Sequence, residues 1–217
     1  MKFCSNCGAT VTRKIPEGDS LLRYVCDACH TIHYQNPRMV VGCVPVWEDK
    51  VLLCKRAIEP RHGLWTVPAG FMENGETLDA GAARETLEEA CARVDIGMLY
   101  AVYNIPHVNQ VYLLFLAKLL DLDFSAGAET LEARLFREDE IPWDQIAFAT
   151  VRNTLTHYFS DRARKQFEFH LNYKGLINLS LGYNLSGRVL HPHRMQDCFV
   201  IAGQFFRKNH IPDKAGV

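Results

Sequence analysis

Long apolar runs, a strong net charge of either sign and an apolar signal core near Met1 are all missing from this sequence. No stretch of about eighteen apolar residues occurs, so no transmembrane helix is predicted. The formal net charge is only −1, and the chain therefore has no overall field that would attract nucleic acid or an anionic membrane. The residues after Met1 lack the apolar core of a signal peptide. We therefore expect a cytoplasmic protein.

Cysteine, in contrast, is well represented, with eight residues. Four of them form two pairs, Cys4-x2-Cys7 and Cys26-x2-Cys29. Two such pairs supply four soft thiolate ligands in the tetrahedral arrangement that Zn²⁺ prefers, which predicts a structural zinc site. A disulfide framework is the alternative, but the other cysteines are scattered and the expected compartment is reducing. Residues 1–34 are therefore predicted to form a zinc ribbon whose fold depends on the metal.

The most informative segment lies between residues 70 and 91. A short glycine-bearing loop, residues 70–76, leads into a predicted helix over residues 77–93. Three glutamates of this helix, Glu85, Glu88 and Glu89, lie at i, i+3 and i+4 and share one face. Like charges at these spacings weaken a helix by about 0.2–0.5 kcal/mol per pair, a cost that a bound Mg²⁺ or Mn²⁺ would offset. The alternative is a solvated acidic face without a ligand.

The spacing around these glutamates carries a resemblance to a known family. Gly70 is followed after five residues by Glu76 and after seven more by the run from Arg84 to Glu89. This order resembles the signature of the Nudix hydrolases, Gly-x5-Glu-x7-Arg-Glu-U-x-Glu-Glu-x-Gly-U, where U is a bulky aliphatic residue. Residues 64–70 also resemble the strand and loop that precede this signature in the family.

Three positions depart from the family pattern. Thr86 and Ala92 stand where the family has large aliphatic residues, and Cys91 replaces the second glycine. That glycine normally ends the helix in a left-handed conformation, which cysteine adopts with strain. We therefore expect the helix to run on slightly or to end without the usual cap.

The 217 residues, 48% of them hydrophobic, are enough for one globular domain and a small appendage. The pattern of strands and helices indicates an α+β protein. The resemblance implies a Nudix α/β/α sandwich with a mixed sheet over residues 38–165, preceded by the ribbon. Residues 166–217 hold a candidate strand at 167–171, a candidate helix at 198–206 and no assigned role. Apolar patterns predict the other strands over residues 38–47, 51–56, 64–68, 94–105, 108–122 and 131–136, with one or two helices between 140 and 164.

The resemblance also implies a role for each matching residue. The metal ligands would be Glu85, Glu88 and Glu89, with the backbone carbonyl of Ala69. Arg84 would orient the glutamates and pair with Glu76, and it counts with Glu88 among the catalytic residues. A general base should lie outside the signature. Its candidate is Glu129, on a loop before a predicted strand, although an ordinary surface glutamate is the alternative.

The substrate prediction rests on what surrounds the signature. NADH pyrophosphatases of this family carry Ser-Gln-Pro-Trp-Pro-Phe-Pro downstream, which this chain lacks. Residues 34–42 and 55–65 resemble more closely the ribbon-bearing ADP-ribose/FAD pyrophosphatases. We expect Mg²⁺-dependent hydrolysis of ADP-ribose or FAD with release of AMP. The alternatives are an NADH pyrophosphatase and a non-enzymatic zinc-ribbon/Nudix module that binds a nucleotide or a nucleic acid.

Candidate substrate contacts flank the signature on both sides. Each of them is explained equally well by strand packing. They are Arg56, Arg61, Tyr103, His107 and Tyr112. A small-molecule nucleotide is the expected partner, a nucleic acid is not expected because residues 1–34 carry only a mild basic excess, and a homodimer is left open.

Overall fold

A computed structural model describes residues 1–173 of the chain. In the ribbon, β1 (Val11–Lys14), β2 (Arg23–Cys26) and β3 (Ile32–His33) form an antiparallel sheet in the order β1-β2-β3. The turn between β1 and β2 includes Gly18 at a φ of +78°, a conformation that glycine adopts without strain. Asp19 then accepts hydrogen bonds from the backbone N–H groups of Ser20 and Leu21. These contacts form the turn of the β1–β2 hairpin.

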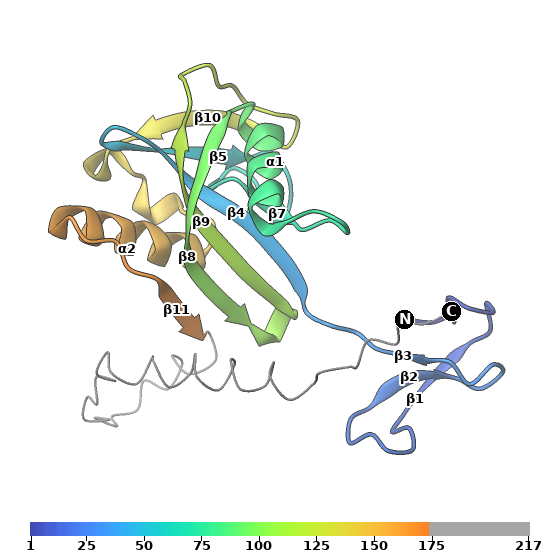
Figure 1. Ribbon diagram of the computed structural model, residues 1–217. Helices are drawn as coiled ribbons and strands as arrows, with labels where there is room; N and C mark the ends of the chain where they lie inside the picture. Colours follow the sequence, from blue (N-terminus) through green and yellow to red (C-terminus); the bar gives the residue numbers. More distant parts are fainter. Residues whose placement is uncertain (174–217) are drawn as a thin grey trace, which may run out of the picture. The chain divides into compact units, whose positions relative to one another are not determined.

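The larger region is built on one mixed sheet (Figure 1). Its strand order is β10-β5-β4-β9-β8-β11, with β6 paired to β5 and β7 paired to β4. The pairs β4/β9 and β8/β11 are parallel and the other pairs are antiparallel. The strands are β4 (Arg38–Trp47), β5 (Lys50–Arg56), β6 (Trp65–Thr66), β7 (Ala69–Phe71), β8 (Val94–Ile105), β9 (Gln110–Leu119), β10 (Thr130–Phe136) and β11 (His170–Tyr173).

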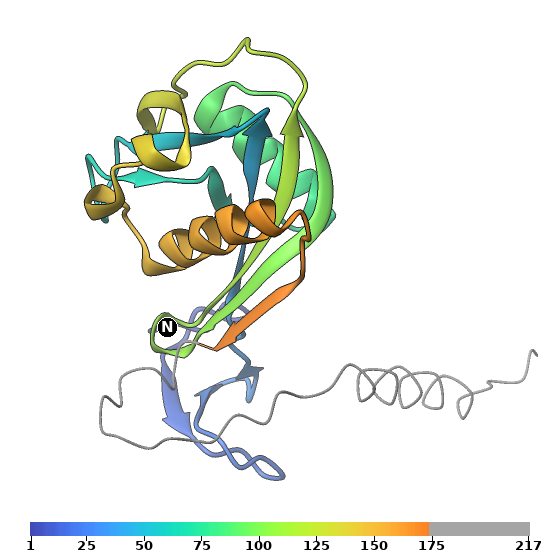
Figure 2. The ribbon, with the colours of Figure 1, turned by 90° about the vertical axis from the view of Figure 1, so that its left-hand side faces the viewer.

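Two helices, α1 (Leu78–Ala90) and α2 (Ala149–Arg164), lie on opposite faces of this sheet (Figure 2). Strand alternation divides the core between them, because successive side chains of a strand point to opposite faces. Cys43 packs in the cluster that contains Ala82 of α1, whereas Val44 packs with Leu155 of α2. The predicted α/β/α sandwich is confirmed. Short 3-10 helices span Pro106–Val108, Glu138–Glu140 and Trp143–Gln145.

The two ends of α1 differ in how well the sequence predicted them. Thr77, the first residue of the predicted helix, is the N-cap, and its side chain accepts a hydrogen bond from the backbone N–H of Ala80. The expected extension beyond residue 91 was wrong. The helix ends at Ala90, and Cys91 takes the left-handed conformation with a φ of 47° and a ψ of 24°. The departure from glycine therefore leaves the usual helix end intact.

Several other boundaries shift. The single strand predicted at residues 64–68 is replaced by β6 and by β7, which the sequence did not indicate. The last strand begins at His170, three residues later than predicted. The predicted helix at 198–206 lies outside the described residues. Within residues 1–173, no helix is long and apolar enough to cross a bilayer.

Asp161 joins α2 to the far edge of the sheet. Its side chain is fully buried, and its Oδ2 accepts hydrogen bonds from the Tyr100 hydroxyl (2.8 Å) and from Nε2 of His170 (2.9 Å). Arg164 donates to Oδ1. Burial alone would raise the pKa of Asp161, but the hydrogen bonds from His170, Tyr100 and Arg164 outweigh it and lower the pKa to about 2. The ionised carboxylate thus stabilises the contact of α2 with β8 and β11.

We expect Asp161→Asn to lower the free energy of unfolding at pH 7 by about 1.5–3 kcal/mol, because hydrogen bonds to a buried charge are lost. The folded-state pKa of Asp161 is depressed from 3.8 to about 2, so its contribution is complete above pH 4 and disappears as the pH falls toward 2. Urea unfolding followed by tryptophan fluorescence at pH 7 and pH 3 measures this. The difference between variant and wild type should narrow at pH 3, and a pH-independent difference would contradict the account. Asp144→Asn, at an exposed position, is the control.

Candidate active site and zinc site

An open cleft of about 1110 Å³ lies in the region of residues 38–151. It brings together residues from β4, β5, β7, α1, β9 and the loops before β10 and α2. Acidic and basic side chains share its lining, which is the arrangement needed to hold both a cation and an anionic group. The acidic residues are Glu59, Glu73, Glu85, Glu88, Glu89 and Glu129, and the arginines are Arg38, Arg56, Arg61 and Arg84.

Gly70 determines how closely the loop approaches Glu85. A methyl group at residue 70 would place its carbon 2.3 Å from Oε2 of Glu85, well inside van der Waals contact. Only glycine therefore lets the carboxylate lie against the backbone of β7. Glu85 is 8% exposed, and burial raises the pKa of its carboxyl group against the opposing effect of Arg84.

Arg84 organises three carboxylates at once. Its Nε and Nη2 donate to the two oxygens of Glu76, at 3.0 and 2.9 Å, in the bidentate geometry of a guanidinium–carboxylate pair. Its Nη1 donates to Oε1 of Glu85 (2.8 Å) and to Oε2 of Glu88 (3.0 Å). The hydrogen bonds from Arg84 lower the pKa of Glu76 to about 2. The expected pairing of Arg84 with Glu76 is therefore present, and Glu76 is not among the residues that line the cleft.

Glu89 is held by a contact that the sequence did not indicate. The backbone N–H of Ala69 donates to Oε2 of Glu89 at 3.2 Å. Burial raises the pKa of Glu89 to about 8, and the negative charge of Glu85 adds to the effect. In the absence of a cation, Glu89 therefore tends to keep its proton near neutral pH.

This donor set fits a hard divalent cation. Glu85, Glu88 and Glu89 line one cleft and offer carboxylate oxygens, the ligands that Mg²⁺ and Mn²⁺ prefer. Burial raises the pKa values of Glu85 and Glu89 against the opposing charges of Arg84 and Arg56. A divalent ion would stabilise the ionised carboxylates. Ala69 also lines the cleft, and the proposed role of its carbonyl as a ligand stays a prediction.

Glu129 lies where the sequence placed it, on a loop that reaches the cleft. It is exposed, and its backbone carbonyl accepts a hydrogen bond from the N–H of Ala57 at 2.9 Å. Its charge contributes to the raised pKa of Glu89, so the two carboxylates lie in the same part of the cleft. This location suits a general base, and that role stays a prediction.

Four of the five predicted substrate contacts line the cleft, namely Arg56, Arg61, His107 and Tyr112. The guanidinium of Arg56 lies 5.3 Å from the centre of the Phe148 ring, and its Nε donates to the carbonyl of Pro60. It is therefore held in one orientation before any anion arrives.

Tyr103 is the exception among the predicted contacts. It is fully buried in the core beneath α2, and its hydroxyl is hydrogen-bonded to Oγ1 of Thr154 at 3.0 Å. The strand alternation of β8 points it inward, so the structure corrects its assignment as a substrate contact.

Arg38, Phe71 and Phe148 are among the cleft residues that sequence reasoning did not single out. The guanidinium of Arg38 lies 4.5 Å from the centre of the Phe71 ring, a cation–π distance. Phe71 follows Gly70 directly and is 46% exposed, so an aromatic residue inside a polar loop was the available signal. The sequence gives no comparable signal for Arg38 and Phe148, because they reach the cleft only through the pairing of distant elements.

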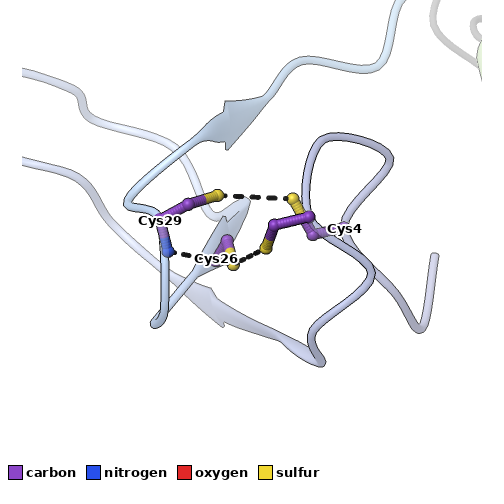
Figure 3. A group of neighbouring side chains, drawn as sticks. Cys4, Cys26 and Cys29 are labelled. Carbon is purple, nitrogen blue, oxygen red and sulfur yellow. Dashed lines mark hydrogen bonds between the residues drawn. The ribbon is translucent and has the colours of Figure 1, made fainter.

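The four ribbon cysteines form a second, separate cluster. Their sulfur atoms all lie within 4.8 Å of one another, with Cys4 and Cys29 at 3.6 Å and Cys7 and Cys26 at 3.5 Å (Figure 3). Tetrahedral Zn²⁺ with Zn–S bonds of about 2.3 Å requires sulfur separations near 3.8 Å, whereas a disulfide requires about 2.05 Å. The cluster therefore fits a structural zinc ion and not the disulfide alternative.

Comparison with known proteins identifies the family of both regions of the chain. The family model described as Nudix N-terminal, a zinc ribbon, matches residues 2–35, and the NUDIX domain model matches residues 36–158. The chain belongs to the Nudix family. Nudix enzymes use Mg²⁺ or Mn²⁺, in agreement with the oxygen ligands of the cleft, and the family resemblance inferred from the signature is confirmed.

Individual relatives differ in their named substrates. A crystal structure of a Nudix hydrolase from Nitrosomonas europaea is 62% identical, with a TM-score of 0.77, and covers 80% of this chain and 100% of that chain. An NAD-capped RNA hydrolase, NudC, of Vibrio vulnificus is 32% identical over 74% of this chain and 62% of its own length. An ADP-ribose pyrophosphatase of Methanocaldococcus jannaschii is 30% identical over 53% of this chain and 69% of its own. The chain thus spans less than two thirds of the NudC relative.

We expect Cys26→Ser to lose the zinc that the wild-type chain carries at about one ion per chain. One thiolate fewer leaves an incomplete tetrahedron, so metal content measured by mass spectrometry should fall well below that of the wild type. Cys91→Ser, at an exposed cysteine outside the cluster, should keep its zinc. Full zinc content in Cys26→Ser would argue against a four-cysteine site.

We expect Mn²⁺ to bind the cleft more tightly as the pH rises toward 8. A protonated Glu89 cannot bind a metal ion, and its pKa of about 8 means that Mn²⁺ must displace a proton at lower pH. The apparent Kd should therefore fall by up to about tenfold per pH unit between pH 6 and 8. Electron paramagnetic resonance titrations measure it. Glu89→Gln should flatten the dependence of the apparent Kd on pH. The control Glu132→Gln, at an exposed strand position, should keep it. Equal slopes in the wild type and both variants would refute the assignment of Glu89 as the titrating ligand.

Proposed function

We propose that this chain hydrolyses the diphosphate bond of nucleoside diphosphate derivatives, most readily ADP-ribose or FAD, and releases AMP. The observation that carries the proposal is the shared cleft, in which the carboxylates of α1 lie together with Arg56 and Arg61. Hydrolysis of a diphosphate needs both the carboxylates, which bind a cation, and the arginines, because the negative charge must be neutralised before a water molecule can attack phosphorus.

The charged residues of the cleft would have separate roles in this hydrolysis. A divalent cation bound by Glu85, Glu88 and Glu89 would supply charge neutralisation and a more acidic water molecule. Arg56 and Arg61 would bind the oxygens of the diphosphate, and the fixed orientation of Arg56 lowers the entropic cost of that contact. Arg84 would keep the glutamates in place, and Glu129 would accept a proton from the attacking water.

A second candidate is the hydrolysis of NADH or of an NAD-capped RNA. The similarity to proteins named NAD-capped RNA hydrolases favours it, whereas the missing Ser-Gln-Pro-Trp-Pro-Phe-Pro motif counts against it. The charges of the ribbon support a small-molecule substrate. Lys14 pairs with Asp27 and Arg23 pairs with Asp19, which leaves little free positive charge for an RNA backbone.

The proposal predicts that the zinc-loaded protein with Mg²⁺ releases AMP from ADP-ribose or FAD faster than from NADH or NAD-capped RNA. Turnover of each substrate, followed by chromatographic identification of the products, measures this preference. Faster cleavage of NADH or of the capped RNA would replace the first candidate by the second. No cleavage of any member of the panel, together with nucleotide binding, would favour the non-enzymatic module.

Glu88→Gln should abolish AMP release without changing the fold, because the substitution removes a charged ligand at a side chain that is 58% exposed. Glu132→Gln is the matched control, since Glu132 is an exposed glutamate that does not line the cleft. Undiminished turnover in Glu88→Gln would overturn the role of Glu88. Circular dichroism verifies that both variants are folded.

A further inference from the structure

The loop before β10 lies directly on the C-terminal end of α1. Helix ends leave backbone carbonyls without partners inside the helix. Here the carbonyl of Ala90 accepts a hydrogen bond from the N–H of Ser125 at 2.9 Å, and the carbonyl of Glu89 accepts one from the N–H of Gly127 at 3.0 Å. The loop therefore caps the helix whose side chains form the acidic side of the cleft.

Gly127 comes closer to the helix than any other residue type allows. A methyl group at this position would place its carbon 1.8 Å from the backbone carbonyl oxygen of Glu88, in a helix that cannot yield as a flexible side chain does. The φ of Gly127 lies outside the left-handed region. Its backbone conformation is therefore no reason for glycine, and the close approach is the reason that remains.

The same loop carries Glu129 into the cleft. The N–H of Thr130 donates to the carbonyl of Gly127 at 3.1 Å, and the N–H of Ala57 donates to the carbonyl of Glu129 at 2.9 Å. Glu129 is thus fixed between α1 on one side and the end of β5 on the other. Its distance from Glu88 and Glu89 is set by how deeply residue 127 docks onto the helix.

We propose that Gly127 is a positioning residue for hydrolysis, which sets the place of the Glu129 carboxylate relative to the metal-binding glutamates. This inference rests on the proposed function, in which Glu129 takes the proton of the attacking water. A side chain at residue 127 must lift the loop by more than an ångström to reach ordinary contact with the Glu88 carbonyl. Such a displacement moves Glu129 while leaving every cleft side chain chemically unchanged.

The test is a double-mutant cycle of Gly127→Ala with Glu129→Gln, with ADP-ribose and Mg²⁺ as the probe. Gly127→Ala should lower kcat by about tenfold to a hundredfold, the usual effect of a displacement near one ångström, with little change in KM. Glu129→Gln alone should lower kcat by about a hundredfold or more. In the Glu129→Gln background, Gly127→Ala should change kcat by less than about twofold, because the group it positions is already absent.

Two readouts separate positioning from a general structural defect. The Kd of Mn²⁺ should change by less than about twofold in Gly127→Ala, because the metal-binding side chains are untouched. Ala126→Ser, at the exposed neighbouring position of the same loop, should keep wild-type kcat. Multiplicative effects in the cycle, unchanged kcat in Gly127→Ala, or a kcat loss that follows a loss of Mn²⁺ affinity would each overturn the proposal.

A second variant keeps the test decisive if Gly127→Ala does not fold. Ser125→Pro removes the N–H that bonds to the Ala90 carbonyl and directs a ring carbon at that carbonyl, so the loop must lift from the helix end while Gly127 is kept. It should lower kcat in the wild-type background and not in the Glu129→Gln background, and equal losses in both would overturn the proposal. If Glu129→Gln alone keeps full turnover, the positioning role falls, while AMP release by the wild type still supports the proposed hydrolysis.

Discussion

The rest of the site depends on the hydrogen bonds that the guanidinium of Arg84 donates to three glutamates. It bonds bidentately to Glu76 and at the same time to Glu85 and Glu88. Without it, three carboxylates on and before one helix would repel each other across a half-buried surface. Because the bonds to Glu76 fix the guanidinium plane, the remaining N–H groups can hold the other two glutamates toward the cleft. The hydrogen bonds of Arg84 thus organise the acidic surface.

Close backbone approaches complete this arrangement from two sides. Gly70 brings β7 against the carboxylate of Glu85, and Gly127 brings the loop before β10 against the carbonyl of Glu88. Both contacts act on α1, one near its acidic face and one at its C-terminal end. The geometry of the cleft therefore depends on these two glycines as much as on the charged residues that line it.

Local patterns in the sequence predicted what local physics determines. The spacing from Gly70 to Glu89 predicted the helix and its acidic face, and the cysteine pairs predicted the cluster of four sulfur atoms. The end of α1 was not predictable, because the loop that caps Glu89 and Ala90 is distant in sequence. The prediction of Tyr103 as a substrate contact was wrong for a related reason. Only the pairing of β8 with its neighbours decides which side of the sheet Tyr103 faces.

In the proposed reaction, Glu85, Glu88 and Glu89 hold the cations that bind the diphosphate. The most direct measurement is anomalous diffraction from crystals that contain Mn²⁺ and a non-hydrolysable ADP-ribose analogue. The account predicts Mn²⁺ within about 2.2 Å of these carboxylate oxygens and of a diphosphate oxygen, the range of ordinary metal–oxygen bonds. Manganese bound elsewhere, with Arg84 as the sole cation beside the three glutamates, would contradict it.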